Sequence, residues 1–180
     1  TTEAGRQVIS YIVRCAIPAD RVIEKTYANV TYRFQGQIGL APEWETEAMT
    51  VANRHWVSAC LMAHVNTAGD HVQILLVGSH PALGGYGGRL QDFGAQEAAF
   101  FGDLFETREA YFCQGWGIDR SIVEGRLGSN QLGAPYRNAF PNELCAQNCT
   151  PADFPYATEG FKACMGWNEV LTVWRRDGYA

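Results

Sequence analysis

The clearest hydrophobic pattern in the chain is a helical stripe near its beginning. In residues 3–16 the apolar side chains recur three and four positions apart, which predicts an amphipathic helix: Val8, Ile9, Ile12, Val13 and Ala16. Thr2 directly precedes this segment and can cap the helix, because a threonine oxygen can accept a hydrogen bond from a first-turn amide. Pro18 ends it, since proline has no backbone N–H to donate.

A second helix is predicted over residues 51–65, with Thr50 as its N-terminal cap. Residues 56–63, its later half, are apolar nearly all round. A helix of this kind has no face suited to water, so it is buried on most sides. We therefore expect this helix to lie at the centre of the fold.

Other segments have the patterns of β-strands. Residues 29–37 alternate between apolar and polar side chains, which predicts a half-buried strand. Residues 72–77 form a short run rich in branched side chains and predict a buried strand. Residues 110–113 predict a short strand, and residues 168–174 predict a strand with two largely apolar faces.

A third helix is predicted over residues 95–105 by a stripe of four apolar side chains: Ala98, Phe101, Leu104 and Phe105. Gly102 lies inside this segment and costs a helix about 1 kcal/mol relative to alanine. A close packing approach at that position would justify the cost. A short helix is also expected within residues 152–164.

Helices and strands alternate irregularly, which is typical of the α+β class. We expect a small, mainly antiparallel sheet packed by two or three helices. The chain has 180 residues and neither a repeat nor a low-complexity linker, so residues 1–180 are expected to form a single domain.

Composition and charge exclude several classes of protein. With 47% apolar and 18% charged residues, the chain is not of the intrinsically disordered type. Its formal net charge of −5 disfavours a nucleic-acid binder, which needs a basic face. No apolar run approaches the roughly 18 residues of a membrane span. The sequence also lacks the phosphate-binding pattern G-x-x-x-x-G-K, the zinc-protease pattern H-E-x-x-H and the hydrolase pattern G-x-S-x-G.

The six cysteines favour disulfide bonds and therefore an oxidising, extracellular compartment. Cys15 and Cys60 lie on the two apolar helices, and we expect them to pair. Cys145 and Cys149 are one helical turn apart, a poor geometry for pairing with each other, so each is expected to pair with Cys113 or Cys164. The alternative is a four-thiolate zinc site formed by these last four cysteines. A chain that starts at Thr1 without methionine also fits a secreted protein after removal of its signal peptide.

Candidate chemistry is concentrated in the Gly-rich segment 78–94. His80 could act there as a base, with Asp92 or Glu97 as its carboxylate partner, in a hydrolase or lyase. The alternative is a solvated histidine beside carboxylates at a helix start. Cys60 and His64 are four residues apart and share a helix face, which would suit a thiolate–imidazole pair unless Cys60 is oxidised.

Two further groups of residues suggest binding. Glu43, Glu45 and Glu47 alternate around Trp44, and a carboxylate pair beside an aromatic ring is typical of a glycosidase subsite, although a solvated acidic patch has the same pattern. Aromatic residues in predicted loops, Trp44, Tyr86 and Trp116, could form a surface that binds a sugar or a partner. His55 and His64 are nine residues apart and on opposite helix faces, so they do not form a helical metal pair.

Several stretches together resemble a family of secreted proteins from myxobacteria and related bacteria to which no activity is assigned. They are residues 11–18 (YIVRCAIP), 34–44 (FQGQIGLAPEW), 54–66 (RHWVSACLMAHVN), 97–105 (EAAFFGDLF) with 111–114 (YFCQ), and 167–173 (WNEVLTV). The resemblance implies a bacterial source, export and disulfide bonds. Members of that family carry further cysteines between Cys113 and Cys145, where this chain has none.

Two functions from different classes follow from these observations. The first is a secreted, non-enzymatic structural or binding protein that assembles with further copies, as an oligomer, a filament or a surface subunit. It is favoured because the sequence contains no assembled catalytic constellation, and neither a cofactor nor a metal is expected. The alternative is a secreted hydrolase or lyase that uses residues 78–94.

Overall fold

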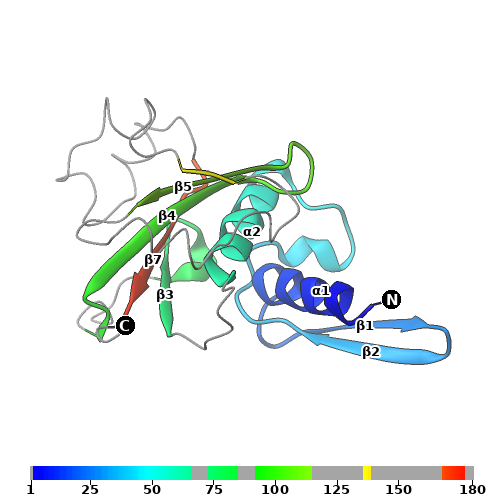
Figure 1. The fold of residues 1–180 in the computed structure, drawn as a ribbon. Coiled ribbons are helices and arrows are strands. Elements are labelled where there is room, and N and C mark those ends of the chain that lie inside the picture. Colours follow the sequence, from blue (N-terminus) through cyan, green and yellow to red (C-terminus); the bar gives the residue numbers. More distant parts are fainter. Residues whose placement is uncertain (1, 66–72, 85–91, 115–135, 139–167, 177–180) are drawn as a thin grey trace.

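The first helix forms where the sequence predicts it. The computed structural model describes residues 2–65, 73–84, 92–114, 136–138 and 168–176 (Figure 1). Helix α1 spans Glu3–Ala16, and the Thr2 side chain accepts a hydrogen bond from the Gly5 amide at 3.2 Å. The helix ends before Pro18, as expected for a residue that cannot donate to the helical ladder.

The C-terminal carbonyls of α1 are satisfied by a neighbouring segment of chain. Amides within residues 37–41 donate hydrogen bonds to three of them and to the carbonyl of the residue that follows the helix, at 2.8–3.0 Å: Ile38 to Arg14, Leu40 to Cys15, Ala41 to Ala16 and Gln37 to Ile17. Gly36 is required just before this segment, because a β-carbon there would lie 2.2 Å from the Pro18 carbonyl oxygen. These hydrogen bonds and the close approach of Gly36 to Pro18 therefore hold the end of α1 in place.

The second helix, α2, spans Val51–His64 and is the central element, as predicted. The Thr50 side chain caps it by accepting a hydrogen bond from the Asn53 amide at 3.1 Å. Residues 56–63 are all buried. The absence of a polar face in the sequence thus corresponds to contacts on nearly every side.

A two-stranded hairpin lies between the helices in sequence. Strand β1 (Val22–Tyr27) pairs antiparallel with β2 (Val30–Gln35). The turn between them has positive φ at both Ala28 (48°) and Asn29 (62°), the geometry of a tight two-residue turn. The strand predicted over residues 29–37 is therefore confirmed as β2, whereas β1 was not predicted.

The main sheet has five strands in the order β3-β7-β4-β5-β6. They are β3 (Ile74–Val77), β4 (Ala95–Asp103), β5 (Glu109–Gln114), β6 (Tyr136–Asn138) and β7 (Leu171–Arg175). All neighbours are antiparallel except β5 and β6, which are parallel. The strands predicted over residues 72–77, 110–113 and 168–174 correspond to β3, β5 and β7.

The helix predicted over residues 95–105 is wrong, because this segment forms β4, the middle strand of the sheet. Residues 97–103 are all buried, and helix α2 packs on the strand. A strand buried on both faces shows no alternation of polar and apolar residues, so its spacing resembled a helix by coincidence. Gly102 has φ of +138°, a conformation that favours glycine within this strand.

The elements stack in successive layers (Figure 1). Helix α2 packs on the five-stranded sheet, α1 packs on α2, and the hairpin packs on α1 through β2. Two short 3-10 helices, η1 (Pro42–Glu45) and η2 (Pro81–Leu83), complete the described part of the chain. The fold is α+β, with a small, mainly antiparallel sheet and a disulfide, as expected.

Two remaining structural expectations have different outcomes. No helix among the described residues is long and apolar enough to cross a membrane. The helix expected within residues 152–164 lies outside the described residues.

Candidate functional site

A disulfide joins the two helices at the centre of the molecule. Cys15 of α1 and Cys60 of α2 are bonded, with their Cα atoms 6.0 Å apart, and both side chains are fully buried. This confirms the pairing predicted from the sequence. Because Cys60 is oxidised, no thiolate is available in this state for the nucleophile considered from its spacing to His64.

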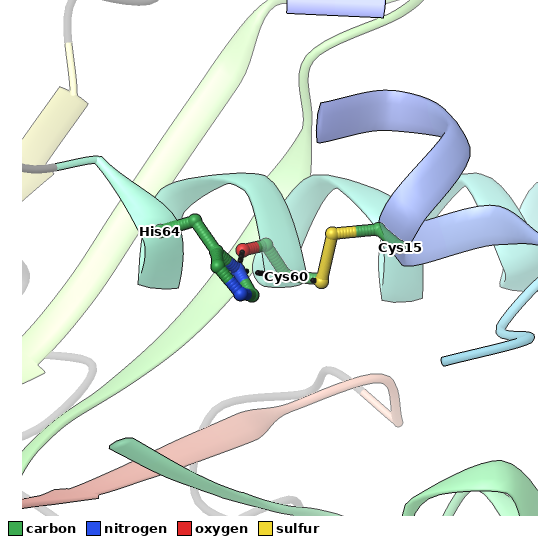
Figure 2. The surroundings of a disulfide bond; sticks show 3 residues. All are labelled: Cys15, Cys60 and His64. Atoms are coloured by element: carbon green, nitrogen blue, oxygen red, sulfur yellow. Dashed lines mark hydrogen bonds between the residues drawn. A yellow bond between two sulfur atoms is a disulfide. The ribbon is translucent and has the colours of Figure 1, made fainter. Parts of the chain in front are cut away.

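His64 lies directly beside this disulfide (Figure 2). Its Nδ1 is 2.8 Å from the carbonyl oxygen of Cys60 and 3.7 Å from the Cys60 sulfur. The Tyr11 ring packs beside the imidazole, with the ring centroids 6.0 Å apart. The helix therefore presents Cys60 and His64 on one face, as their spacing predicts, and the α1 helix closes that face with Cys15 and Tyr11.

A cluster of charged side chains lies on the opposite side of α2. Arg54 forms ion pairs with Asp103 (3.3 Å), the last residue of β4, and with Glu106, in the turn that follows this strand. His55 lies between two carboxylates, with Nε2 3.7 Å from Asp103 and Nδ1 3.1 Å from Glu169. These contacts fasten α2 to two parts of the sheet. His55 and His64 thus have different partners, consistent with their predicted positions on opposite faces.

Asp103 is the centre of this charged cluster. Its side chain is only 3% exposed, and its Oδ1 accepts hydrogen bonds from the amides of Phe105 and Glu106 at 2.9 and 3.1 Å. The carboxylate thereby closes the turn after β4 and also pairs with Arg54. Sequence reasoning missed this role because the same segment was predicted to be helical, which hides the strand end where an aspartate closes a turn.

His80 caps the short helix η2. Its Nδ1 accepts a hydrogen bond from the Ala82 amide at 3.1 Å, and its ring lies edge-on to Trp56 with the centroids 5.6 Å apart. Burial lowers the pKa of His80, and the nearby Glu43 carboxylate offsets part of that effect. A neutral imidazole whose Nδ1 accepts this bond carries its proton on Nε2, so the arrangement favours capping over general-base chemistry.

The carboxylates proposed as partners of His80 lie elsewhere. Asp92 is exposed, whereas Glu97 is fully buried within β4. The carboxylate that interacts electrostatically with His80 is Glu43. The structure therefore offers His80 a different acid from the two that the sequence suggested.

The acidic residues around Trp44 support the fold. Glu43 accepts hydrogen bonds from the Asn53 side chain (2.8 Å) and the Thr50 amide (3.3 Å). Burial raises the pKa of Glu43, but these bonds outweigh it and hold the pKa below its usual value. Glu45 pairs with Arg21 at 2.8 Å. Two of the three acids thus make structural contacts, whereas Glu47 is exposed.

The aromatic residues proposed for binding have different surroundings. Trp44 is half-buried and packs against the hydrophobic core, which indicates an anchor for its loop. Tyr86 and Trp116 lie outside the described residues, as do Cys145, Cys149 and Cys164. Cys113 lies on β5.

Exposed apolar side chains gather on the layer formed by α1 and the hairpin. Seven large apolar side chains in the described part of the chain are exposed, and five of them belong to this layer: Val8, Ile9, Tyr11, Tyr27 and Val30. The N-terminal half of α1 and the hairpin tip lie at the same end of the molecule (Figure 1). An apolar group of this kind on one end of a protein is typical of an interaction surface.

Comparison with known proteins adds no family to this description. No family model, curated protein or solved structure matches the chain.

Proposed function

We propose that the protein works outside the cytoplasm as a disulfide-fastened, non-catalytic subunit that assembles with further copies of itself. The observation that carries the proposal is the apolar stripe of α1, which is buried at one end and exposed at the other. Ile9, Val13 and Ala16 follow one row of the helix, and the last two are fully buried. Ile9 itself is 39% exposed.

The neighbouring row of α1 has the same gradient. Val8 is 57% exposed, Ile12 packs against the core, and Cys15 is fully buried in the disulfide. Each apolar row therefore extends beyond the core that covers its C-terminal half. Since burial contributes about 25 cal/mol per Å² of apolar surface, an interface that covers Val8 and Ile9 would be favourable.

A second copy of the chain suits this surface because the molecule presents two apolar elements at one end, the α1 stripe and the hairpin tip. If the stripe packs on the same stripe of another copy, the contact is isologous and closes as a dimer. If it packs on the hairpin tip of another copy, around Tyr27 and Val30, the contact is heterologous and can propagate as a filament. The size of the assembly distinguishes these two arrangements.

The proposed compartment rests on the cysteines. A buried Cys15–Cys60 disulfide is stable in an oxidising environment and uncommon in the reducing cytoplasm. The resemblance to secreted bacterial proteins supports the same location.

The experiment is light scattering and electron microscopy of the oxidised protein over a range of concentrations. The wild-type chain should form concentration-dependent assemblies, and the double variant Val8→Glu with Ile9→Glu should remain monomeric. The matched control is Val51→Glu, which changes an equally exposed valine (59%) in the first turn of α2 and should assemble as the wild type does. A wild-type monomer at every concentration would overturn the proposal.

A further inference from the structure

We propose that Cys15, Cys60 and His64 form a site for a thiophilic divalent metal ion such as zinc once the disulfide is reduced. Their ligand atoms all lie within 4.8 Å of one another. Figure 2 shows the three side chains converging from α1 and α2 on one point. The inference goes beyond the assembly proposed above, because it concerns the reduced state of the Cys15–Cys60 disulfide and not the exposed apolar surface.

The geometry of two of the ligands is already close to that of a zinc site. Zinc bonds of about 2.3 Å to sulfur and about 2.0 Å to nitrogen place tetrahedral ligands roughly 3.6 Å apart. The Cys60 sulfur and the His64 Nδ1 are 3.7 Å apart. These residues are four positions apart on α2, so the helix fixes their separation.

The third ligand comes from α1, which the fold holds in place independently of the disulfide. The Cα atoms of Cys15 and Cys60 are 6.0 Å apart, a distance compatible with two sulfurs on one ion. The hydrogen bonds from residues 37–41 to the end of α1 hold Cys15 near this position after reduction. Reduction then lets the two sulfurs separate to the spacing of zinc ligands.

The charge and polarity of the site also suit a divalent ion. Two thiolates neutralise the two positive charges, so a buried complex carries no net charge and avoids most of the desolvation cost. Both cysteines are fully buried, whereas His64 is half-buried at the boundary beside Tyr11. A water molecule at that boundary can complete four ligands.

The chemistry balances with a dithiol as reductant. The dithiol transfers two electrons and two protons to the Cys15–Cys60 disulfide, which becomes two thiols while the dithiol becomes a disulfide. The metal ion then displaces both thiol protons to solvent. Neutral His64 moves its proton from Nδ1, which donates it to the Cys60 carbonyl, to Nε2, and the ring turns so that the Nδ1 lone pair faces the ion.

Both the oxidised state, with its disulfide, and the reduced, metal-bound state link α1 to α2. The disulfide does so covalently, and the metal ion does so through one ligand from α1 and two from α2. A chain folded under reducing conditions would therefore keep its two helices together until the cysteines are oxidised.

Cobalt(II) tests the proposal, because it reports thiolate ligands and tetrahedral geometry by visible and near-ultraviolet absorption. The titration uses reduced protein without oxygen, in a variant with Cys113, Cys145, Cys149 and Cys164 changed to serine so that these cannot bind. One cobalt ion per chain should bind, with bands of thiolate ligation that zinc abolishes. His64→Ala should weaken binding by at least about 100-fold, because losing a ligand costs more than losing an outer partner.

The matched control is His80→Asn, which changes a histidine on another element and keeps its capping role, and it should bind cobalt as tightly as the parent. If the four-serine variant does not fold, the same titration is read as the difference between wild type and His64→Ala. Absence of thiolate bands, or equal affinity in the His64→Ala variant, would overturn the proposal. Because assembly is measured on the oxidised protein, neither result depends on the proposed function.

Discussion

Helix α2 is held on two sides by different means. On one side Cys60 is bonded covalently to Cys15 of α1, in a fully buried corner. On the other side Arg54 forms an ion pair with Asp103, and His55 contacts Asp103 and Glu169, at distances of 3.1–3.7 Å. The disulfide stabilises mainly by restricting the unfolded chain, whereas the ion pairs act only in the folded state.

This difference predicts how each side responds to change. A covalent link does not depend on pH or salt, and it disappears only on reduction. The contribution of the charged side to stability depends on which partners remain after a substitution. A buried carboxylate or guanidinium that has lost its partner is more costly than a pair that is absent altogether. The two sides can therefore be broken separately.

The largest expected effect comes from removing the disulfide. In the chain-entropy model, a link across 45 residues stabilises the fold by roughly 4 kcal/mol. Changing both Cys15 and Cys60 to alanine should lower the free energy of unfolding in urea by about that amount. Each single change should cost nearly as much as the pair, since either one opens the bond. A loss below about 1 kcal/mol would show that the link contributes little to stability.

A smaller effect is expected on the charged side from Asp103→Asn. The change keeps the shape but leaves Arg54 without its buried acid, so unfolding free energy should fall by about 3 kcal/mol. The control is Glu106→Gln, which also removes a partner of Arg54 but at a carboxylate that is 64% exposed. This control should cost less than about 1 kcal/mol. Equal losses for the two variants in urea unfolding would contradict the importance of burial at Asp103.

The smallest effect concerns the pH dependence of His80. Its pKa in the folded protein is below the ordinary 6.5, because burial disfavours the charged ring. The unfolded chain therefore binds the proton more readily, and this contribution to stability is present above pH 6.5 and lost as the pH falls from there through the lower pKa of the folded protein. His80→Asn keeps an acceptor for the Ala82 amide but does not titrate.

Unfolding free energy of this variant should consequently fall less steeply from neutral pH to about pH 5 than that of the wild type. Glu43 does not confuse the comparison, because its pKa lies below 4.5 and its stabilising bonds are lost only at lower pH. An identical slope in the two proteins would show that His80 is as easily protonated in the folded state as in the unfolded one.

The regions that the sequence predicted well are those with a local signal. Helices α1 and α2 begin at the threonine caps Thr2 and Thr50 and end within a residue of their predicted limits. The Cys15–Cys60 pair followed from the apolar positions of both residues on these helices. Strand β2 followed from its alternation, because one face of the hairpin meets α1 and the other meets water.

The regions that were missed depend on contacts far apart in sequence. Strand β4 lies in the middle of the sheet with residues 97–103 all buried, and burial on both faces removed the alternation that identifies a strand. Strand β1 is largely exposed, and its signal was the turn at Asn29, which was instead counted as part of the next strand. The cluster around Asp103 could not be predicted, because it joins residues from α2, the end of β4 and the chain before β7.

The most direct test of the account is peptide mass spectrometry of the protein isolated from the medium of the cells that make it, alkylated before digestion and without reduction. The account predicts a cross-linked pair of peptides that contains Cys15 and Cys60, with neither residue alkylated. Alkylated Cys15 and Cys60, or retention of the protein inside the cells, would contradict an exported chain fastened by this disulfide.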